Sequence, residues 1–168
     1  ESWGVKPSAV IGHSVGEVAA AHVSGALPLD EAARLVVLRG RTMQKATGHG
    51  KMAWVALRAE NIMPLLVGHE HAIAIAAVND PDSVILSGEI ETMDRILSEL
   101  SRRGVNTRLL RVNYAFHSPQ MAPLADEFVA ALGDLTLNDS ALPIYSTVTG
   151  QRIDGIALTA QYWGRNIR

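Results

Sequence analysis

Short hydrophobic runs alternate with longer amphipathic stretches along the first third of the chain. Residues 8–12 form an apolar run that ends at Gly12, which predicts a buried strand. The alanine-rich stretch 15–25 and the stretch 29–46 each have the composition and spacing of a helix. A buried strand followed directly by helices is typical of an α/β fold.

The rhythm changes near residue 51, where shorter elements begin. Strand-like stretches at 52–57, 72–78, 83–88 and 105–112 enclose helix-like stretches at 59–68 and 90–104. The order β-α-β-β-α-β is the ferredoxin-like pattern. We therefore predict a small inserted subdomain at 51–111, within a larger α/β part made of residues 1–50 and 112–168.

The larger part resumes after the insert with a loop and further elements. The expected elements are a loop at 114–121, a helix at 119–133, a strand and turn at 142–150, and a helix at 159–168. Both ends of the sequence fall beside expected elements. We therefore expect a fragment of a longer polypeptide.

Composition narrows the class of protein. The 168 residues are 48% hydrophobic and 19% charged, which is a globular profile. A formal net charge of −2 gives no basic surface for nucleic acid or an anionic membrane. No cysteine, membrane-length apolar run or signal-peptide pattern is present, so we expect no metal site built on thiolates and a cytoplasmic location.

The stretch IGHSVGE at 11–17 has the spacing G-x-S-x-G between the first strand and the first helix. That context is required for a nucleophile elbow, which would present the hydroxyl of Ser14. Gly12 and Gly16 would let strand and helix approach closely, and the N–H of Val15 would point toward an oxyanion. The alternative is a small-residue turn without chemistry.

A serine nucleophile needs a base, and six histidines are available. His117 lies in the loop YAFHSPQM, outside the insert and beside apolar residues, so we predict that it is the base. His13 adjoins Ser14 in sequence, and we expect it to form part of the pocket wall or to be structural. The remaining histidines are expected to be packed or solvated: His22, His49, His69 and His71.

The helix at 29–46 carries a cation on its apolar face. At about 100° per residue, Arg39 falls in the middle of an apolar arc. The arc consists of Ala32, Leu35, Val36, Leu38, Thr42 and Met43. A buried guanidinium is costly unless it is paired. Either Arg39 makes a structural ion pair with an acid elsewhere, or it binds an anion at the site.

Four separated blocks resemble one family, the acyltransferase domains of modular polyketide and fatty acid synthases and the malonyl-CoA:acyl carrier protein transacylases. The blocks are GHSVGEVAAAHVSGALPLDEAARLVVLRGRTMQ, VNYAFHSPQMAPLADEF, PIYSTVTG and YWGRNIR. The resemblance implies an α/β-hydrolase-like subdomain with a ferredoxin-like insert. It also implies that Ser14 is the acylated nucleophile, that His117 is its base and that Arg39 binds the carboxylate of the extender unit. Asn166 matches a position that helps to orient the histidine in the family.

The resemblance also implies a ping-pong reaction. An acyl-CoA would acylate the serine, and the phosphopantetheine thiol of an acyl carrier protein would then take the acyl group. No cofactor would be bound by this segment itself. The implied partners are malonyl-CoA or methylmalonyl-CoA, the carrier protein, and a ketosynthase and other domains of the same polypeptide.

Three residues bear on the choice of extender unit. Phe116 before the histidine and Val15 after the serine resemble malonyl-selective members of the family. Methylmalonyl-selective members more often carry serine and glutamine at these positions, although Tyr114 is a residue that they share. We expect malonyl, with methylmalonyl as the alternative, because Phe116 would fill the space of an α-methyl group.

Intact family members have a preceding stretch whose glutamine-bearing loop supplies the second oxyanion N–H. We therefore expect weak or no activity from this segment alone. One rival function is a serine hydrolase, either a thioesterase or a patatin-like lipase in which Asp154 would pair with the serine. Another is an inactive structural module of a synthase.

Overall fold

The computed structural model describes residues 3–168. These residues form two compact units. The serine unit consists of residues 3–41 and Asp126–Ile167, and the histidine unit consists of Thr42–Ala125 with Arg168. The two units are named after the candidate residues Ser14 and His117 that they contain.

The serine unit is built on a three-stranded sheet with the order β1-β6-β7. Its strands are β1 (Val10–Ile11), β6 (Ile144–Tyr145) and β7 (Arg152–Ile153), and its short helices are α1 (Gly16–Val23), α6 (Ala160–Asn166) and the 3₁₀ helix η2 (Gly155–Ala157). The pairing of β1 with β6 is parallel and that of β6 with β7 is antiparallel. Parallel pairing brings together segments more than 130 residues apart in the chain.

The prediction of a buried first strand is wrong in extent and in burial. The strand β1 has two residues, and Ile11 is 69% exposed. The reason is its position at the edge of the sheet, where β6 is its neighbour on one side. The strand β7 and the helix η2 were not predicted, because two or three residues carry too little periodicity to be recognised.

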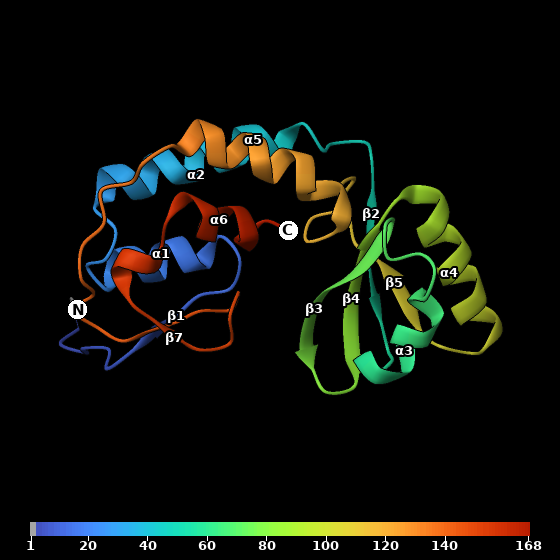
Figure 1. Ribbon diagram of the computed structural model, residues 1–168. Helices are drawn as coiled ribbons and strands as arrows, with labels where there is room; N and C mark the ends of the chain where they lie inside the picture. Colours follow the sequence, from blue (N-terminus) through green and yellow to red (C-terminus); the bar gives the residue numbers. More distant parts are fainter. Residues whose placement is uncertain (1–2) are drawn as a thin grey trace. The chain divides into compact units, whose positions relative to one another are not determined.

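Two longer helices, α2 (Leu29–Gln44) and α5 (Ala122–Leu132), lie above α1 and α6 in Figure 1. The 3₁₀ turn η1 (Pro119–Met121) leads into α5. The apolar arc predicted for α2 is buried at Leu35 and Met43, and Arg39 is only 8% exposed. Val36 departs from the prediction, since it lies at one edge of the arc and is 41% exposed.

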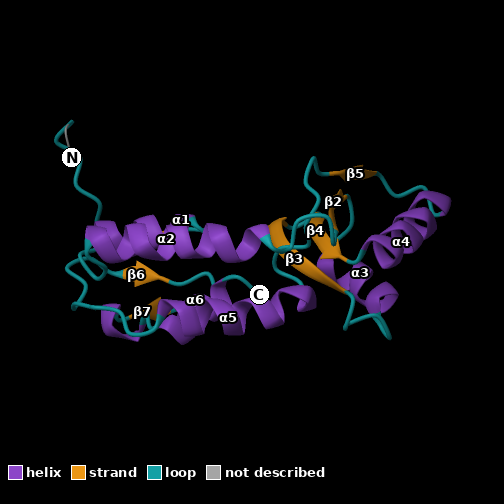
Figure 2. Cartoon of the chain, turned by 90° about the horizontal axis from the view of Figure 1, so that it is seen from above, coloured by secondary structure: helices purple, strands orange, loops and turns teal. Residues whose placement is uncertain are grey.

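The histidine unit contains a four-stranded antiparallel sheet with the order β3-β4-β2-β5. Its strands are β2 (Lys51–Val55), β3 (Ile73–Asp80), β4 (Ser83–Gly88) and β5 (Thr107–Leu109). The helices α3 (Ala59–Leu66) and α4 (Ile90–Arg102) cover one face of the sheet, as Figures 1 and 2 show. This order and these connections give the predicted ferredoxin-like fold.

Alternation along β2 shows how the sequence builds this unit. Ala53 and Val55 are fully buried under the helices, whereas Trp54 between them faces the opposite side. Ile62 of α3 and Met93 of α4 complete the core from the helix side. The strand β5 is shorter than predicted, and it follows Gly104, whose φ of 74° ends α4.

The predicted insert and the observed unit have different limits. The four strands of this sheet and the helices α3 and α4 fall within residues 51–109, inside the predicted insert 51–111. The histidine unit extends further, to Thr42 and Ala125. No helix within residues 3–168 has the length and apolar character needed to cross a membrane.

Candidate active site

Ser14 and His117 have an unusual backbone conformation. Among residues 3–168 they are the non-glycine residues with positive φ, at 54° and 58°. Such a conformation is unfavourable for an L-residue and persists where the surroundings hold it, most often at functional sites. The two strained residues are the two that the sequence singled out as nucleophile and base.

The turn that carries Ser14 is tight because of Gly12. A Cβ on Gly12 would lie 2.1 Å from the carbonyl oxygen of Gly16, so no side chain fits there. The turn closes with a hydrogen bond from the Gly16 N–H to the carbonyl of His13 (2.9 Å) and another from the Glu17 N–H to that of Ser14 (3.1 Å). Gly16 takes part in this close approach only through its carbonyl group. A Cβ on Gly16 itself would meet open space, so only Gly12 has to be a glycine for steric reasons.

Arg39 reaches the candidate nucleophile. Its Nη2 donates a hydrogen bond to Ser14 Oγ at 2.8 Å. The guanidinium is buried, its Nε has no partner, and within residues 3–168 it makes no ion pair with a carboxylate. Burial lowers the pKa of Arg39. The alternative of a structural ion pair is therefore not observed, and the cation remains available to an anion bound beside Ser14.

Below the elbow lies a buried carboxylate that the sequence analysis did not single out. Glu17 is fully buried in the first turn of α1. Its oxygens accept hydrogen bonds from the hydroxyl of Tyr162, the side-chain amide of Asn166, and the N–H and hydroxyl of Thr147. Burial and the neighbouring Glu17 raise the pKa of Tyr162.

Asn166 connects this carboxylate with the serine turn. Its Nδ2 donates to Glu17 Oε2 at 2.6 Å and lies 3.4 Å from the carbonyl oxygen of Ser14. Its Oδ1 is buried and has no hydrogen-bond partner within residues 3–168. The amide of Asn166 thus supports the nucleophile turn, a contact that the family resemblance did not imply.

The loop that carries His117 is anchored on both sides. Ala115 packs so closely on Gly50 that a Cβ there would lie 2.4 Å from that of Ala115. Ser118 donates to the carbonyl of Ala115 at 2.6 Å, and the Gly48 N–H donates to that of Asn113 at 2.6 Å. Beside these anchors, Nδ1 of His117 lies 3.4 Å from the main-chain oxygen of Arg168.

The two aromatic residues of the same loop stack on each other. The ring centroids of Tyr114 and Phe116 are 3.8 Å apart, and the ring planes differ by 15°. Each ring limits the rotamers of the other. Two of the three residues linked by the family resemblance to extender choice, Tyr114 and Phe116, therefore form one aromatic wall within the histidine unit.

The remaining candidates occupy ordinary positions. Val15 is 48% exposed and immediately precedes α1, whose N-terminus carries a partial positive charge. His13 is exposed, and His22 Nδ1 contacts the carbonyl of Leu27 at 3.0 Å. Within the described residues, no three His, Cys, Asp or Glu side chains are grouped as metal ligands.

The strained serine at a strand–helix turn and the ferredoxin-like unit are the two features that the resemblance to acyltransferase domains leads us to expect. The profile of the acyl transferase domain matches residues 1–168. The chain therefore belongs to the acyl transferase domain family.

Known relatives are modular synthases. The chain is 45% identical to polyketide synthase GfsB of Streptomyces halstedii, over 100% of this chain and 3% of the synthase. It is 42% identical to erythronolide synthase EryA2 of Saccharopolyspora erythraea, over 99% of this chain and 5% of the synthase. The chain thus spans a small part of the curated relatives that it matches.

Solved structures agree in fold over nearly the whole chain. The acyltransferase domain from module 8 of the salinomycin polyketide synthase matches with a TM-score of 0.94 and 39% identity, over 98% of this chain and 39% of that one. The malonyl CoA-acyl carrier protein transacylase of Coxiella burnetii matches with a TM-score of 0.89 and 27% identity, over 98% and 54%. These matches confirm the predicted fold class.

Proposed function

We propose that this segment loads a carboxylated acyl group, malonyl, from acyl-CoA onto the phosphopantetheine thiol of an acyl carrier protein in a polyketide synthase. Membership of the acyl transferase domain family supports the reaction class. The similarity to modular synthases supports the carrier protein, a ketosynthase and other synthase domains as partners. We place the proposed reaction in the cytoplasm. No bound cofactor is part of this proposal.

Two half-reactions would follow. His117 removes the proton of Ser14 as Oγ attacks the thioester carbon, and the N–H of Val15 at the start of α1 stabilises the oxyanion. Coenzyme A leaves as the thiol, taking up a proton from the imidazolium. The carrier thiol then transfers its proton to His117 as its sulfur attacks the acyl-serine ester carbon. His117 returns that proton to Oγ, which leaves as the serine hydroxyl.

The observation that carries the proposal is the contact between Arg39 and Ser14. A buried guanidinium within 2.8 Å of the nucleophile, with no carboxylate paired to it in the described chain, suits a substrate that brings its own carboxylate. An acetyl group would leave this cation unpaired. Such an unpaired charge discriminates more strongly than a missing methylene would.

The aromatic wall of Tyr114 and Phe116 supports malonyl over methylmalonyl, since stacking leaves Phe116 less able to turn away from an α-methyl group. One methyl group changes binding by only about 1–3 kcal/mol. The preference should therefore be incomplete. Competition between the two CoA esters tests it, and a preference for methylmalonyl would make the alternative extender the substrate.

Intact-protein mass spectrometry of the full-length protein tests the proposed function. Incubation with malonyl-CoA should add one malonyl mass to the wild type and none to Ser14→Ala. Addition of holo-carrier protein should then move this mass to the carrier. Release as free malonate instead would support a hydrolase, and absence of any serine-dependent adduct would support a structural module.

A further inference from the structure

We propose that Glu17 is a positioning residue, which holds the strained turn of Ser14 in its reactive geometry through Asn166. The inference rests on the proposed role of Ser14 as nucleophile. Glu17 lies three residues after the serine, is fully buried, and forms no ion pair within residues 3–168. A buried carboxylate without a cation is costly, so its retention calls for a specific set of hydrogen bonds.

The hydrogen bonds of Glu17 use both carboxylate oxygens fully. Oε1 accepts from the Tyr162 hydroxyl and from the Thr147 N–H at 3.0 Å, and Oε2 accepts from Asn166 Nδ2 at 2.6 Å and from the Thr147 hydroxyl at 3.2 Å. The Thr147 hydroxyl has one hydrogen and also lies 3.3 Å from the carbonyl oxygen of Gly12, so it can donate to either acceptor. The other three groups donate to Glu17, and an amide of the same shape would turn an N–H group toward the Asn166 Nδ2 donor.

Asn166 transmits this arrangement to the nucleophile. Because Nδ2 serves both Glu17 and the Ser14 carbonyl, the amide cannot rotate by half a turn without losing both contacts. The carbonyl oxygen that accepts from Asn166 Nδ2 belongs to Ser14, the residue whose backbone φ is 54°. Displacement of the amide would therefore relax the turn and move Oγ relative to the thioester.

The test compares Glu17→Gln with wild type in the full-length protein, by single-turnover acylation of Ser14. We expect the acylation rate per folded site to fall on the order of tenfold or more, with the KM for malonyl-CoA unchanged. Glu31→Gln is the matched control, because Glu31 also accepts a main-chain and an arginine hydrogen bond in the serine unit. Its acylation rate should equal that of wild type.

Two further variants separate positioning from stability. Tyr162→Phe removes one donor to Glu17 but leaves Asn166 in contact, so it should lower stability with little effect on acylation. The double variant Glu17→Gln with Asn166→Asp restores donor–acceptor pairing but not the N–H to Ser14, so stability should recover while acylation stays slow. An acylation rate equal to that of wild type in Glu17→Gln, or recovery of the acylation rate in the double variant, would overturn the proposal. Absence of acylation in wild type would instead overturn the proposed function.

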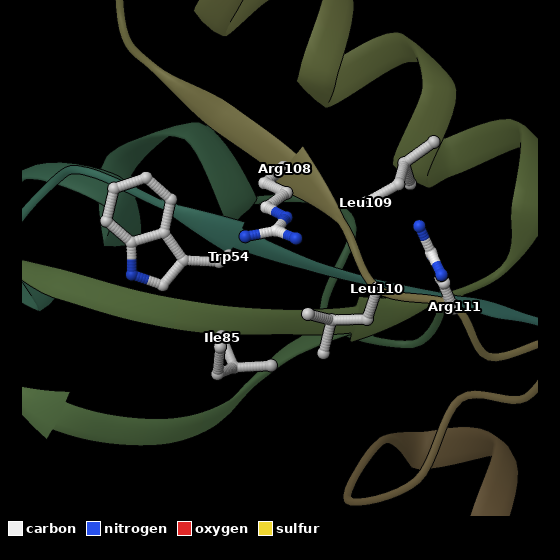
Figure 3. A pocket seen from close by; sticks show the side chains of 6 residues that line it. All are labelled: Trp54, Ile85, Arg108, Leu109, Leu110 and Arg111. Atoms are coloured by element: carbon white, nitrogen blue, oxygen red, sulfur yellow. The ribbon is translucent and has the colours of Figure 1, made fainter.

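A second feature lies in the histidine unit and is independent of Glu17. An open pocket of about 500 Å³ lies on the sheet, and Figure 3 shows its lining residues, with Trp54 and Arg108 in register on the adjacent strands β2 and β5. Its lining consists of Trp54, Ile85, Arg108, Leu109, Leu110 and Arg111. Neither Arg108 nor Arg111 makes an ion pair within residues 3–168.

We infer that this pocket takes the adenosine phosphate end of the acyl-CoA donor, an inference that rests on the proposed use of acyl-CoA. An indole face offers a stacking surface to a base, and unpaired guanidinium groups match phosphate. The strand that supplies Arg108 continues directly into the loop of His117. The ligand of this pocket and the candidate base are thus linked through one continuous segment.

Comparison of two donors tests the inference. In Arg108→Ala and Trp54→Ala of the full-length protein, the KM for malonyl-CoA should rise about tenfold, equivalent to one lost charged contact. The KM for malonyl-N-acetylcysteamine, which lacks the nucleotide, should not change. The exposed Arg95 of α4 serves as control through Arg95→Ala.

Three results would contradict this assignment. One is an unchanged KM for malonyl-CoA in Arg108→Ala, a substitution at an exposed side chain that should leave the fold intact. Another is an equal rise for both donors. The third is a rise in the KM for the holo-carrier protein as acyl acceptor, with the KM for malonyl-CoA unchanged. That result would make the pocket a docking surface for the carrier protein.

Discussion

Ser14 combines strain with electrostatic contact. Its φ is positive within a turn where Gly12 lies close to Gly16, and its hydroxyl accepts a hydrogen bond from the buried Arg39. A guanidinium so close stabilises negative charge beside the oxygen. We therefore expect the acylation of this serine to depend on three residues that do not react themselves: Gly12, Gly16 and Arg39.

Arg39→Ala should change the choice of acyl donor. Loss of a charge-assisted pair costs about 1.5–3 kcal/mol, so acylation by malonyl-CoA should fall roughly 10- to 100-fold while acylation by acetyl-CoA stays the same or rises. Parallel kinetics with the two donors measure this change. Arg41→Ala, an exposed arginine of the same helix, is the control and should affect neither donor. An equal fall with both donors would count against a carboxylate-binding role.

Gly12 and Gly16 should respond oppositely to alanine. Gly12→Ala forces a Cβ against main-chain atoms and should destabilise by about 1–3 kcal/mol or prevent folding. Gly16→Ala meets open space at the start of α1 and should stabilise by about 0.5–1 kcal/mol. Urea unfolding of both variants measures the difference. Equal effects at the two positions would contradict the observed approach of strand and helix.

At the scale of elements, hydrogen bonds join α2 to the last residue of α5 and to the segment that follows it. Glu31 accepts from the N–H of Thr136 at 3.1 Å and from Arg34 at 2.9 Å, and Arg34 also donates to the carbonyl of Leu132. The Thr136 N–H, followed by Arg34, lowers the pKa of Glu31 below its ordinary value of 4.5. The ionised form is therefore favoured in the folded state.

This lowered pKa predicts a pH dependence of stability. Because the folded value lies below the unfolded one, the stabilisation by Glu31 is fully present above 4.5 and is lost as the pH falls through the lowered pKa. The free energy of unfolding of wild type should exceed that of Glu31→Gln by about 0.5–1 kcal/mol at pH 7. This difference in the free energy of unfolding should shrink below pH 4.5. Urea unfolding at several pH values checks it, and a difference that grows in acid would have the wrong sign.

The helices could be predicted from the sequence because each carries its own periodicity and a glycine or proline boundary. Arg39 was recognised in the same way, from its place on an apolar arc. The Glu17 cluster could not be, since its partners lie 130 to 149 residues away and no local pattern links them. The burial of β1 was predicted wrongly for a similar reason, because burial depends on the neighbours of a strand in the sheet and not on its own apolar residues.

At the scale of the whole molecule, the histidine unit has its own core. Residues from all three of β2, β4 and α4 are buried together there, including Val55, Leu86 and Leu100. The limits of this unit are wider than the insert predicted from sequence. Contacts such as Gly48 with Asn113 and Gly50 with Ala115 explain the extension, since they join the flanking segments to each other.

A fragment of residues 42–125 should therefore fold alone. We expect a cooperative unfolding transition in urea by circular dichroism, and a lower midpoint for a fragment of residues 51–111, which lacks the contacts of Gly48 and Gly50. Equal midpoints would show that the flanking segments add nothing to the unit. A disordered 42–125 fragment would show that this unit depends on the rest of the chain.

Partition of the acyl-enzyme between thiol and water tests the proposed function most directly. Full-length protein acylated with malonyl-CoA and freed of donor is mixed with holo-carrier protein, and the masses of both proteins are followed in time. We predict that malonyl leaves Ser14 and appears on the carrier, with little free malonate. Loss of malonyl as free acid at the same rate with and without carrier would contradict an acyltransferase.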